Sequence, residues 1–457
     1  MIRRITIKKI ACIVLAILFL ISVSNMRSYS YADDSINYEL NTQPRTDELF
    51  KENSFKANDA YVRLIQHFYN SEENVFSEKY GKYSVSGIYG AGFPEYYCGA
   101  YINTDGNLVV EINKNLKKNA IREAQDDIIG ITNGYVPIFR LSDIPYRDLV
   151  LTMSEITDLR EGTDDPDIEL ICTYAVDEYN GQIKIGIEKE SETTETKVLD
   201  SLTYPDIVTF YIVDETPQPC IGNGSYGQPI SYDSVVSNDY FSIGYRARYT
   251  RNGSPVYGFI TCGHGFHDYT GIDTYYASNV FGVNNNAIIY GALIGYIDPY
   301  RNVCTLGANI DATFVELSQY SSVTNQIVTH YGGTYTISTN APANPAIGST
   351  VYSYGASTDD QYGYLQSGYI VSSSTTFYYT YYDANNNPVF TFSVLDTILT
   401  TCCIIPGDSG GPSIYESSSG TYTICGINTG IYAAGLNQYS YHTKGTNITA
   451  QFGLSPY

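Results

Sequence analysis

The sequence predicts a chain in two parts, an α+β segment over residues 33–217 and an all-β domain over residues 218–457. Gly and Tyr are abundant, with 39 and 47 copies in 457 residues, and charged residues make up only 16%. This composition is typical of short strands and turns, and it excludes a coiled coil. Charge differs between the two parts: 16 basic and 35 acidic residues in the first, 5 and 13 in the second. We therefore expect a domain boundary near residue 215.

The net charge of −22 excludes two classes of partner. Nucleic acids and anionic membrane surfaces would both repel a chain of this charge at long range. We expect neither as a partner.

The first 32 residues have the pattern of a secretory signal peptide. Arg3, Arg4, Lys8 and Lys9 precede an apolar run over residues 10–23, and Ser30-Tyr31-Ala32 places small residues at the −3 and −1 positions of a cleavage site. A membrane anchor is the weaker alternative because the run is shorter than the ~18–20 residues needed to span a bilayer. We predict a secreted protein whose mature form has no membrane span.

The acidic segment is predicted to contain two subdomains, over about residues 33–140 and 141–217. Each contains a helix and a hairpin, and the turns Asp105-Gly106 and Asn180-Gly181 supply the positive φ of tight hairpins. Ser142 or Asp143 is expected to cap the second helix. The predicted elements are helices at 57–68, about 143–159 and 190–202, hairpins at 96–112 and 171–187, and a strand at 207–213.

Beyond residue 216 the sequence alternates short β-prone runs with Gly, Asn and Ser, and it predicts no long helix. This spacing favours an antiparallel barrel or sandwich over βαβ units. The predicted strands are 241–248, 256–261, 287–296, 313–317, 377–382 and 421–427.

Export also affects how the cysteines are interpreted. Besides Cys12 in the signal, two cysteines lie in the acidic segment and six in the last part of the chain, and an even number in an exported domain favours disulfides. Six cysteines allow ~15 pairings that sequence alone does not separate. No metal-ligand spacing is present, so we predict no metal and no cofactor.

The strongest chemical motif is Pro406-Gly407-Asp408-Ser409-Gly410-Gly411-Pro412. Glycines on both sides of a serine let backbone N–H groups converge on one point, as an oxyanion hole requires. A nucleophilic serine also needs a base and a carboxylate that orients the base.

His264 and Asp311 supply both groups in a suitable context. His264 ends an apolar strand in Thr261-Cys262-Gly263-His264, and Asp311 lies in Asn309-Ile310-Asp311-Ala312. Together with Ser409 they give the order His, Asp, Ser. The rivals lack this framing by small residues, and we expect them to be solvated loop groups; they are His267, His330, Asp273 and Asp298.

On these motifs the chain resembles the chymotrypsin-like serine proteases, in particular the bacterial secreted branch of the streptogrisins and α-lytic protease. The three motifs are similar to the family's TAGH, its catalytic Asp and its GDSGG. Gly99-Ala100-Tyr101-Ile102 before Gly106-Asn107-Leu108 is similar to the propeptides of this branch. The resemblance covers most of residues 230–430, and it implies two antiparallel six-stranded β-barrels preceded by an α+β propeptide.

The resemblance also implies a role for each residue. His264 would be the general base, Asp311 would orient its ring, Ser409 would be the nucleophile, and the N–H groups of Gly407 and Ser409 would bind the oxyanion. The implied substrate pocket contains no acidic residue, which favours apolar or aromatic residues before the scissile bond. Its residues are Thr401, Cys402, Asn428, Thr429 and Gly430, with Asn428 in place of a family serine.

Two further expectations come from the resemblance, and the disulfide pairings are inferred from the positions of the cysteines in the chain. The propeptide would act as folding assistant and inhibitor of a zymogen cleaved near Gln218-Pro219-Cys220-Ile221. Cys403 would pair with Cys425, with Cys402 as a competitor, and Cys262 would pair with Cys304. Asp408 would need a cation, because the family's arginine is replaced by Ser353. A substitute from Arg246, Arg248, Arg251 or Arg301 is expected, or else the hydroxyls of Ser353 and Tyr354.

A second class of function stays open. The domain would then be a catalytically silent adhesin or binding protein on a protease scaffold, since fold does not fix function. Covalent labelling of Ser409 by a fluorophosphonate discriminates the two.

Overall fold

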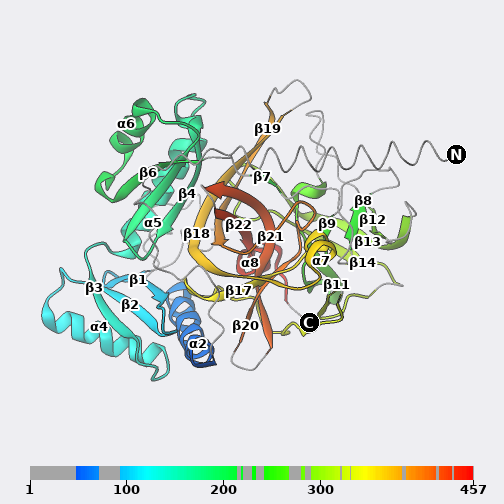
Figure 1. Ribbon diagram of the computed structural model, residues 1–457, viewed down its shortest axis with the longest axis horizontal. Coiled ribbons are helices and arrows are strands. Elements are labelled where there is room, and N and C mark those ends of the chain that lie inside the picture. The colour runs from blue at the N-terminus through cyan, green and yellow to red at the C-terminus, as the bar shows by residue number, and fades with distance from the viewer. Residues whose placement is uncertain are drawn as a thin grey trace, which may run out of the picture. The chain divides into compact units, whose positions relative to one another are not determined.

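The computed structural model in Figure 1 describes most of the chain beyond residue 47. The described residues are 48–70, 93–213, 218–219, 229–232, 241–266, 279–283, 290–319, 322–329, 331–382, 388–417, 421–434, 437–455 and 457. The predicted signal peptide lies outside them. Within these ranges, no helix is both long and apolar enough to cross a membrane. The chain from Thr42 to Tyr457 forms one compact unit.

The first α+β subdomain is built on a three-stranded sheet with the order β1-β2-β3. β1 and β2 form the predicted hairpin, and β3 pairs with β2 in parallel. The connection between those parallel strands is α4, a helix that the sequence analysis did not predict. The elements are α2 (Glu48–Asn70), β1 (Tyr97–Ile102), β2 (Leu108–Asn113), α4 (Lys118–Ile131) and β3 (Ile138–Ser142).

The second subdomain has the predicted order of helix, hairpin, helix and strand. Its first helix begins at Tyr146 after Pro145, so the expected cap at Ser142 or Asp143 is wrong. The residue before a proline is driven out of the helical region, and this places the start of the helix after Ile144. The elements are α5 (Tyr146–Glu161), β4 (Ile171–Asp177), β5 (Gln182–Ile187), α6 (Glu192–Ser201) and β6 (Val208–Ile212).

The last part of the chain is mostly β, as predicted, and its largest sheet includes six antiparallel strands in the order β17-β20-β21-β22-β19-β18. β17 also pairs with β18, so these six close into a ring. β18 also pairs with β4 of the second subdomain, which lies beside it in Figure 1. The strands are β17 (Thr350–Ser353), β18 (Gln366–Tyr382), β19 (Pro388–Thr400), β20 (Pro412–Glu416), β21 (Tyr422–Ala434) and β22 (Asn437–Lys444).

A second sheet has seven strands in the order β10-β11-β14-β13-β12-β8-β9 within the described residues, where six were expected. Its strands are β8 (Pro229–Tyr232), β9 (Phe241–Ser242), β10 (Arg246–Arg251), β11 (Ser254–Thr261), β12 (Asn279–Val283), β13 (Tyr290–Val303) and β14 (Ala312–Leu317). Three short strands lie outside this path, β7 (Gln218–Pro219), β15 (Gln326–Val328) and β16 (Thr334–Thr336). Two short helices were not predicted, α7 (Ala356–Tyr362) and α8 (Gly445–Phe452).

Candidate active site

His264, Asp311 and Ser409 lie in one hydrogen-bonded line. His264 Nδ1 is 2.5 Å from Asp311 Oδ2, and His264 Nε2 is 3.0 Å from Ser409 Oγ. All three residues are fully buried in the full-length chain. The histidine therefore lies between a carboxylate that can orient its ring and a hydroxyl whose proton it can accept.

Strand pairing brings the histidine and the aspartate together. His264 follows β11 and Asp311 precedes β14, and these two strands are antiparallel neighbours with Thr261 opposite Thr313. Beyond the paired ends, the backbone N–H groups of Gly263 and His264 donate to Asp311 Oδ1 at 2.9 and 2.7 Å. These two bonds fix the carboxylate, so its second oxygen faces the imidazole.

Ser409 lies in the loop between β19 and β20, and two of its glycines are required by the geometry. Gly407 has φ +100° and Gly410 has φ +82°, conformations that favour glycine. A side chain at Gly410 would also meet Thr261 Oγ1 at 2.2 Å. β9 supports the loop, because Ser242 N–H donates to the Ser409 carbonyl at 2.8 Å and Ser242 Oγ to the Gly407 carbonyl at 3.0 Å.

Two opposing effects set the pKa of His264. Burial alone lowers it, but the adjacent Asp311 carboxylate stabilises the protonated ring and raises the pKa above its ordinary value. A base with a raised pKa can hold the proton that it takes from a serine hydroxyl.

The partners of the Asp408 carboxylate differ from those that the sequence predicted. Its oxygens accept from the N–H groups of Thr358 at 2.8 Å and Ile405 at 2.9 Å, and from the Thr358 hydroxyl. The prediction that a substitute arginine pairs with Asp408 is therefore wrong. The alternative prediction, that the hydroxyls of Ser353 and Tyr354 bind Asp408, is also wrong. Tyr354 instead donates its hydroxyl to Val328 O. Burial raises the pKa of Asp408 to about 6, and the Thr358 hydroxyl and the backbone donors lower it.

The four arginines named above have other contacts. Arg251 pairs with Glu316 at 2.6 Å and Arg301 with Asp298 at 2.9 Å. Arg246 lies over the ring of Tyr457, and the backbone of Arg248 bonds to that of Ser455. None of these contacts involves Asp408.

The predicted pocket residues lie on two segments, one directly after β19 and one within β21. Thr401 is partly buried, and its hydroxyl accepts from Tyr369 N–H at 3.1 Å. Cys402 packs in the core, with its thiol 3.6 Å from Val351 O. Thr429 is buried with its hydroxyl 2.8 Å from that of Thr443, and Gly430 pairs with Tyr441 in the ladder. Asn428 contacts the nucleophile loop through its side chain.

One rejected rival has an unexpected environment. Asp298 is buried rather than solvated, because Tyr249 OH, Arg301 and Tyr300 N–H all donate to it. His267, His330 and Asp273 lie outside the described residues. Within the described ranges no group of three or more His, Cys, Asp or Glu side chains is arranged to hold a metal ion.

The expected disulfides are wrong for the described cysteines, which are all free thiols. Cys425 faces the core beside Cys402 and lies 3.3 Å from Ser413 Oγ. Cys403 is adjacent to Cys402 in the chain and lies beside Tyr362 instead.

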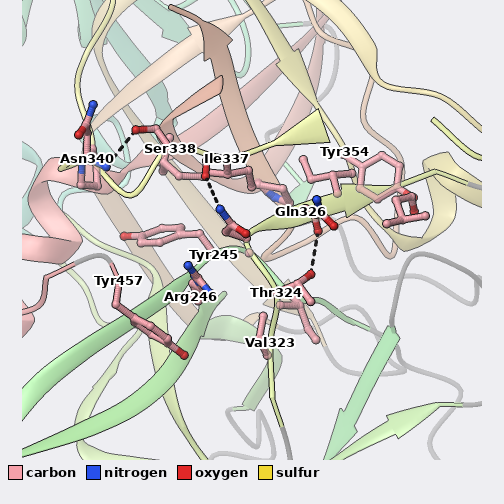
Figure 2. A pocket seen from close by; sticks show the side chains of 18 of the residues that line it. Tyr245, Arg246, Val323, Thr324, Gln326, Ile337, Ser338, Asn340, Tyr354 and Tyr457 are labelled. Carbon is pink, nitrogen blue, oxygen red and sulfur yellow. Dashed lines mark hydrogen bonds between the residues drawn. The ribbon is translucent and has the colours of Figure 1, made fainter. Parts of the chain in front are cut away.

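A separate pocket lies away from the hydrogen-bonded line of His264, Asp311 and Ser409. Figure 2 shows Tyr245, Arg246, Tyr354 and Tyr457 around it, together with polar side chains such as Asn340. Its lining includes none of the three residues of the hydrogen-bonded line. It also has no serine beside a histidine, so we do not place the chemistry there.

Two partners of the site were missed by the sequence analysis. Thr358 binds Asp408 from 50 positions away, and His442 lies on β22 directly opposite Asn428. A hydroxyl residue or a lone histidine in a strand gives no local pattern that would have identified either one.

Residues 45–136 match the family described as Pro-like N-terminal domain. This description agrees with the predicted propeptide. No curated protein matches the chain.

Several solved protease structures are similar to about half of the chain. Protease A of Thermobifida fusca is 22% identical, with 51% of this chain and 97% of that chain covered and a TM-score of 0.33. A glutamic acid specific serine protease is 21% identical over 51% and 99%, with a TM-score of 0.34. The chymotrypsin of Cellulomonas bogoriensis is 21% identical over 51% and 97%, with a TM-score of 0.32.

Proposed function

We propose that this chain is a secreted serine endopeptidase that is made as a zymogen and hydrolyses peptide bonds through an acyl-enzyme. The observation that supports this most directly is the position of His264, within hydrogen-bond distance of both Ser409 and Asp311. Nucleophile, base and orienting carboxylate are the three parts that acyl transfer by a serine requires.

In the proposed reaction, Ser409 Oγ attacks the substrate carbonyl carbon while its proton passes to His264 Nε2. The N–H groups of Gly407 and Ser409 stabilise the negative charge that forms on the carbonyl oxygen. His264 then protonates the leaving amine, the C–N bond breaks, and an ester to Ser409 remains. A water molecule gives a proton to His264 and attacks this ester, which releases the acid and restores the hydroxyl. Asp311 holds the ring throughout.

Two observations support the zymogen. The three residues of the line are fully buried in the full-length chain. In addition, β7 pairs with β21 at Gly430 and Ile431, on the strand that we expect to bind the substrate backbone. We propose that the segment joining propeptide and protease occupies the position that a substrate would take. We propose that residues 33–217 are an inhibitory propeptide and folding assistant, with cleavage near Gln218–Ile221, of which Cys220 and Ile221 lie outside the described residues.

Apolar or aromatic residues before the scissile bond are the proposed preference. The five pocket residues, Thr401, Cys402, Asn428, Thr429 and Gly430, contain no carboxylate that could pair with a buried arginine or lysine side chain. Peptides that differ only at this position test the preference: faster cleavage after Arg or Lys than after Phe or Tyr would contradict it.

Fluorophosphonate labelling tests the function. The matured wild-type chain should carry one label on Ser409, and Ser409→Ala should lose both the label and hydrolysis, by about 10⁴–10⁶ in kcat. Ser413→Ala, a buried serine four residues further along, is the matched control and should keep the label. Hydrolysis that survives in Ser409→Ala would refute the proposal, and an unlabelled wild type would favour the binding protein.

A further inference from the structure

A buried amide lies directly behind the nucleophile loop. Asn428 is fully buried, and its Nδ2 donates to the carbonyl oxygens of Tyr354 at 2.9 Å and Asp408 at 3.2 Å. Asp408 immediately precedes Ser409. Because a carbonyl oxygen only accepts, these two bonds use both amide hydrogens and fix the orientation of the amide. Asn428 Oδ1 must therefore point away from the loop and can only accept.

His442 faces that oxygen from the neighbouring strand. The two residues are opposite each other in the β21–β22 ladder, and His442 Nδ1 is 3.2 Å from Asn428 Oδ1. Since the oxygen accepts, Nδ1 must carry the hydrogen. His442 is fully buried, and this burial lowers its pKa to about 3, so the ring is neutral. A neutral ring has one N–H, which leaves Nε2 as an acceptor.

Thr400 provides the hydrogen that Nε2 needs. Its Oγ1 is 2.8 Å from His442 Nε2, and the same oxygen accepts from Cys402 N–H at 3.2 Å. Every hydrogen bond in this series then has one direction, from the backbone of Cys402 to the carbonyl of Asp408. One end of the series is the predicted pocket segment, and the other is the loop that carries Ser409.

We propose that His442, held as its Nδ1–H tautomer between Thr400 and Asn428, is a positioning residue that couples the substrate-pocket segment to the nucleophile loop. The role rests on the proposed protease function. Asn428 also holds the loop by its backbone, since Gly410 N–H donates to Asn428 O and Asn428 N–H to Gly411 O, both at 2.8 Å. The shorter side chain of a serine, the family's residue here, has one hydrogen to donate and does not span both carbonyls.

The series acts on the position of Ser409 and on the N–H groups beside it. Without the hydroxyl of Thr400, His442 Nε2 becomes a buried acceptor with no donor, and the ring has no reason to keep its tautomer. Asn428 then loses the donor to its oxygen, and its amide is free to turn away from the Asp408 carbonyl. A displaced nucleophile loop weakens contacts made in the transition state, so kcat falls while KM changes little.

Nitrogen NMR tests the tautomer independently of activity. The full-length Ser409→Ala chain is labelled with ¹⁵N-histidine, and the signals that shift in Thr400→Val identify His442. We expect a neutral ring with its hydrogen on Nδ1 at pH 7 and again at pH 5. A hydrogen on Nε2, or a charged ring at pH 5, would overturn the proposal.

Kinetics of the matured wild type and three variants test the coupling. Thr400→Val should lower kcat by about 10- to 100-fold with KM within about two-fold, and Thr400→Ser should restore most of the loss because it keeps the hydroxyl. Thr397→Val is the matched control. Thr397 is also fully buried on β19, and its substitution removes the hydrogen bond to Thr375 O at 2.7 Å, but Thr397 is not part of the series. Equal losses of kcat in Thr400→Val and Thr397→Val would overturn the proposal.

The two proposals fail in different ways. A wild-type chain that neither labels with fluorophosphonate nor cleaves peptides refutes the protease function and, with it, this role of His442. A chain that labels and cleaves but has the other tautomer refutes the role of His442 alone.

Discussion

Asp408 shows how a buried carboxylate is stabilised without a cation. Its charge is distributed over the N–H groups of Thr358 and Ile405 and the hydroxyl of Thr358. Gly355 permits this close approach, because a side chain there would meet Asp408 Oδ1 at 2.5 Å. In this chain these donors, two of them on Thr358 of α7, therefore stabilise the carboxylate in place of the expected arginine.

Removing one of these donors should destabilise the fold. Thr358→Val keeps the shape of the side chain but leaves Asp408 with one hydrogen bond fewer, and we expect a loss of about 1.5–3 kcal/mol in the free energy of unfolding. Urea unfolding of the full-length Ser409→Ala chain measures it. Thr358→Ser retains the hydroxyl and is the control. A Thr358→Val variant as stable as Thr358→Ser would contradict the assignment.

At this scale, small residues that frame a functional group let the sequence predict which side chains lie together. Motifs nominated His264, Asp311 and Ser409, and the structure brings those three together. Thr358 and His442 were missed because their partners are distant in sequence and only the folded strands bring them close. The sequence likewise did not reveal that Cys403 lies beside Tyr362 while Cys425 packs in the core with Cys402.

Four elements of the last part of the chain meet at one buried ion pair. Lys444 at the end of β22 lies 2.5 Å from Asp396 on β19, and the two side chains are 2% and 1% exposed. Asn447 of α8 and Ser374 of β18 also donate to Asp396, at 3.1 and 3.0 Å. This lysine is the only one in residues 218–457.

Lys444→Met should remove this ion pair and leave the Asp396 carboxylate buried without a cation. We expect a loss of about 3–5 kcal/mol in the free energy of unfolding. Adding Asp396→Asn should recover part of it, since the uncompensated charge is then removed. Chemical denaturation of the single and double variants measures the coupling, with the exposed Lys197→Met as a control that changes stability little. Additive effects of the two substitutions would contradict the ion pair.

Elements were predictable where turn chemistry marked them. Asp105-Gly106 and Asn180-Gly181 gave both hairpins, and the structure has Gly106 at φ +80° and Gly181 at φ +63°. α4 was missed because its buried stripe is short, with Ala124 and Ile128 as its buried residues. α7 and α8 are eight residues or fewer, too short for helical periodicity to appear.

For the whole molecule, the contrast in charge suggested a boundary near residue 215 but not the continuous sheet that crosses it. β4 adds to β18, and at the end of β4 Glu178 is inserted into the seam between them. It is 1% exposed and accepts from Ser373 and from Tyr146 OH at 3.2 Å. Burial raises the pKa of Glu178 to about 7, and these donors, Ala100 N–H and the more distant Lys444 lower it.

This carboxyl should make the seam less stable as pH rises. Its pKa is higher in the fold than the ordinary 4.5, so its stabilising contribution is fully present below pH 4.5 and is lost as pH rises through about 7. Between pH 4.5 and pH values above 7, the stabilising contribution of Glu178 should fall by about 3 kcal/mol. We expect unfolding of the full-length Ser409→Ala chain between pH 4.5 and 8 to show this decline, and Glu178→Gln to show less of it. Identical pH profiles would contradict the prediction.

The pairing of β7 with β21 has a kinetic consequence. Gln218 and Pro219 are held on Ile431 and Gly430 of their own chain, so the local concentration of this segment at that strand is set by the covalent connection and not by the amount of protein in solution. The first cut should therefore be a unimolecular event. We expect the half-time for loss of full-length chain to stay constant on hundred-fold dilution, as followed by gel electrophoresis. A half-time that lengthens in proportion to dilution would mean that one molecule cuts another. A chain that matures in this way can be secreted into a large volume, at vanishing concentration, and still become active.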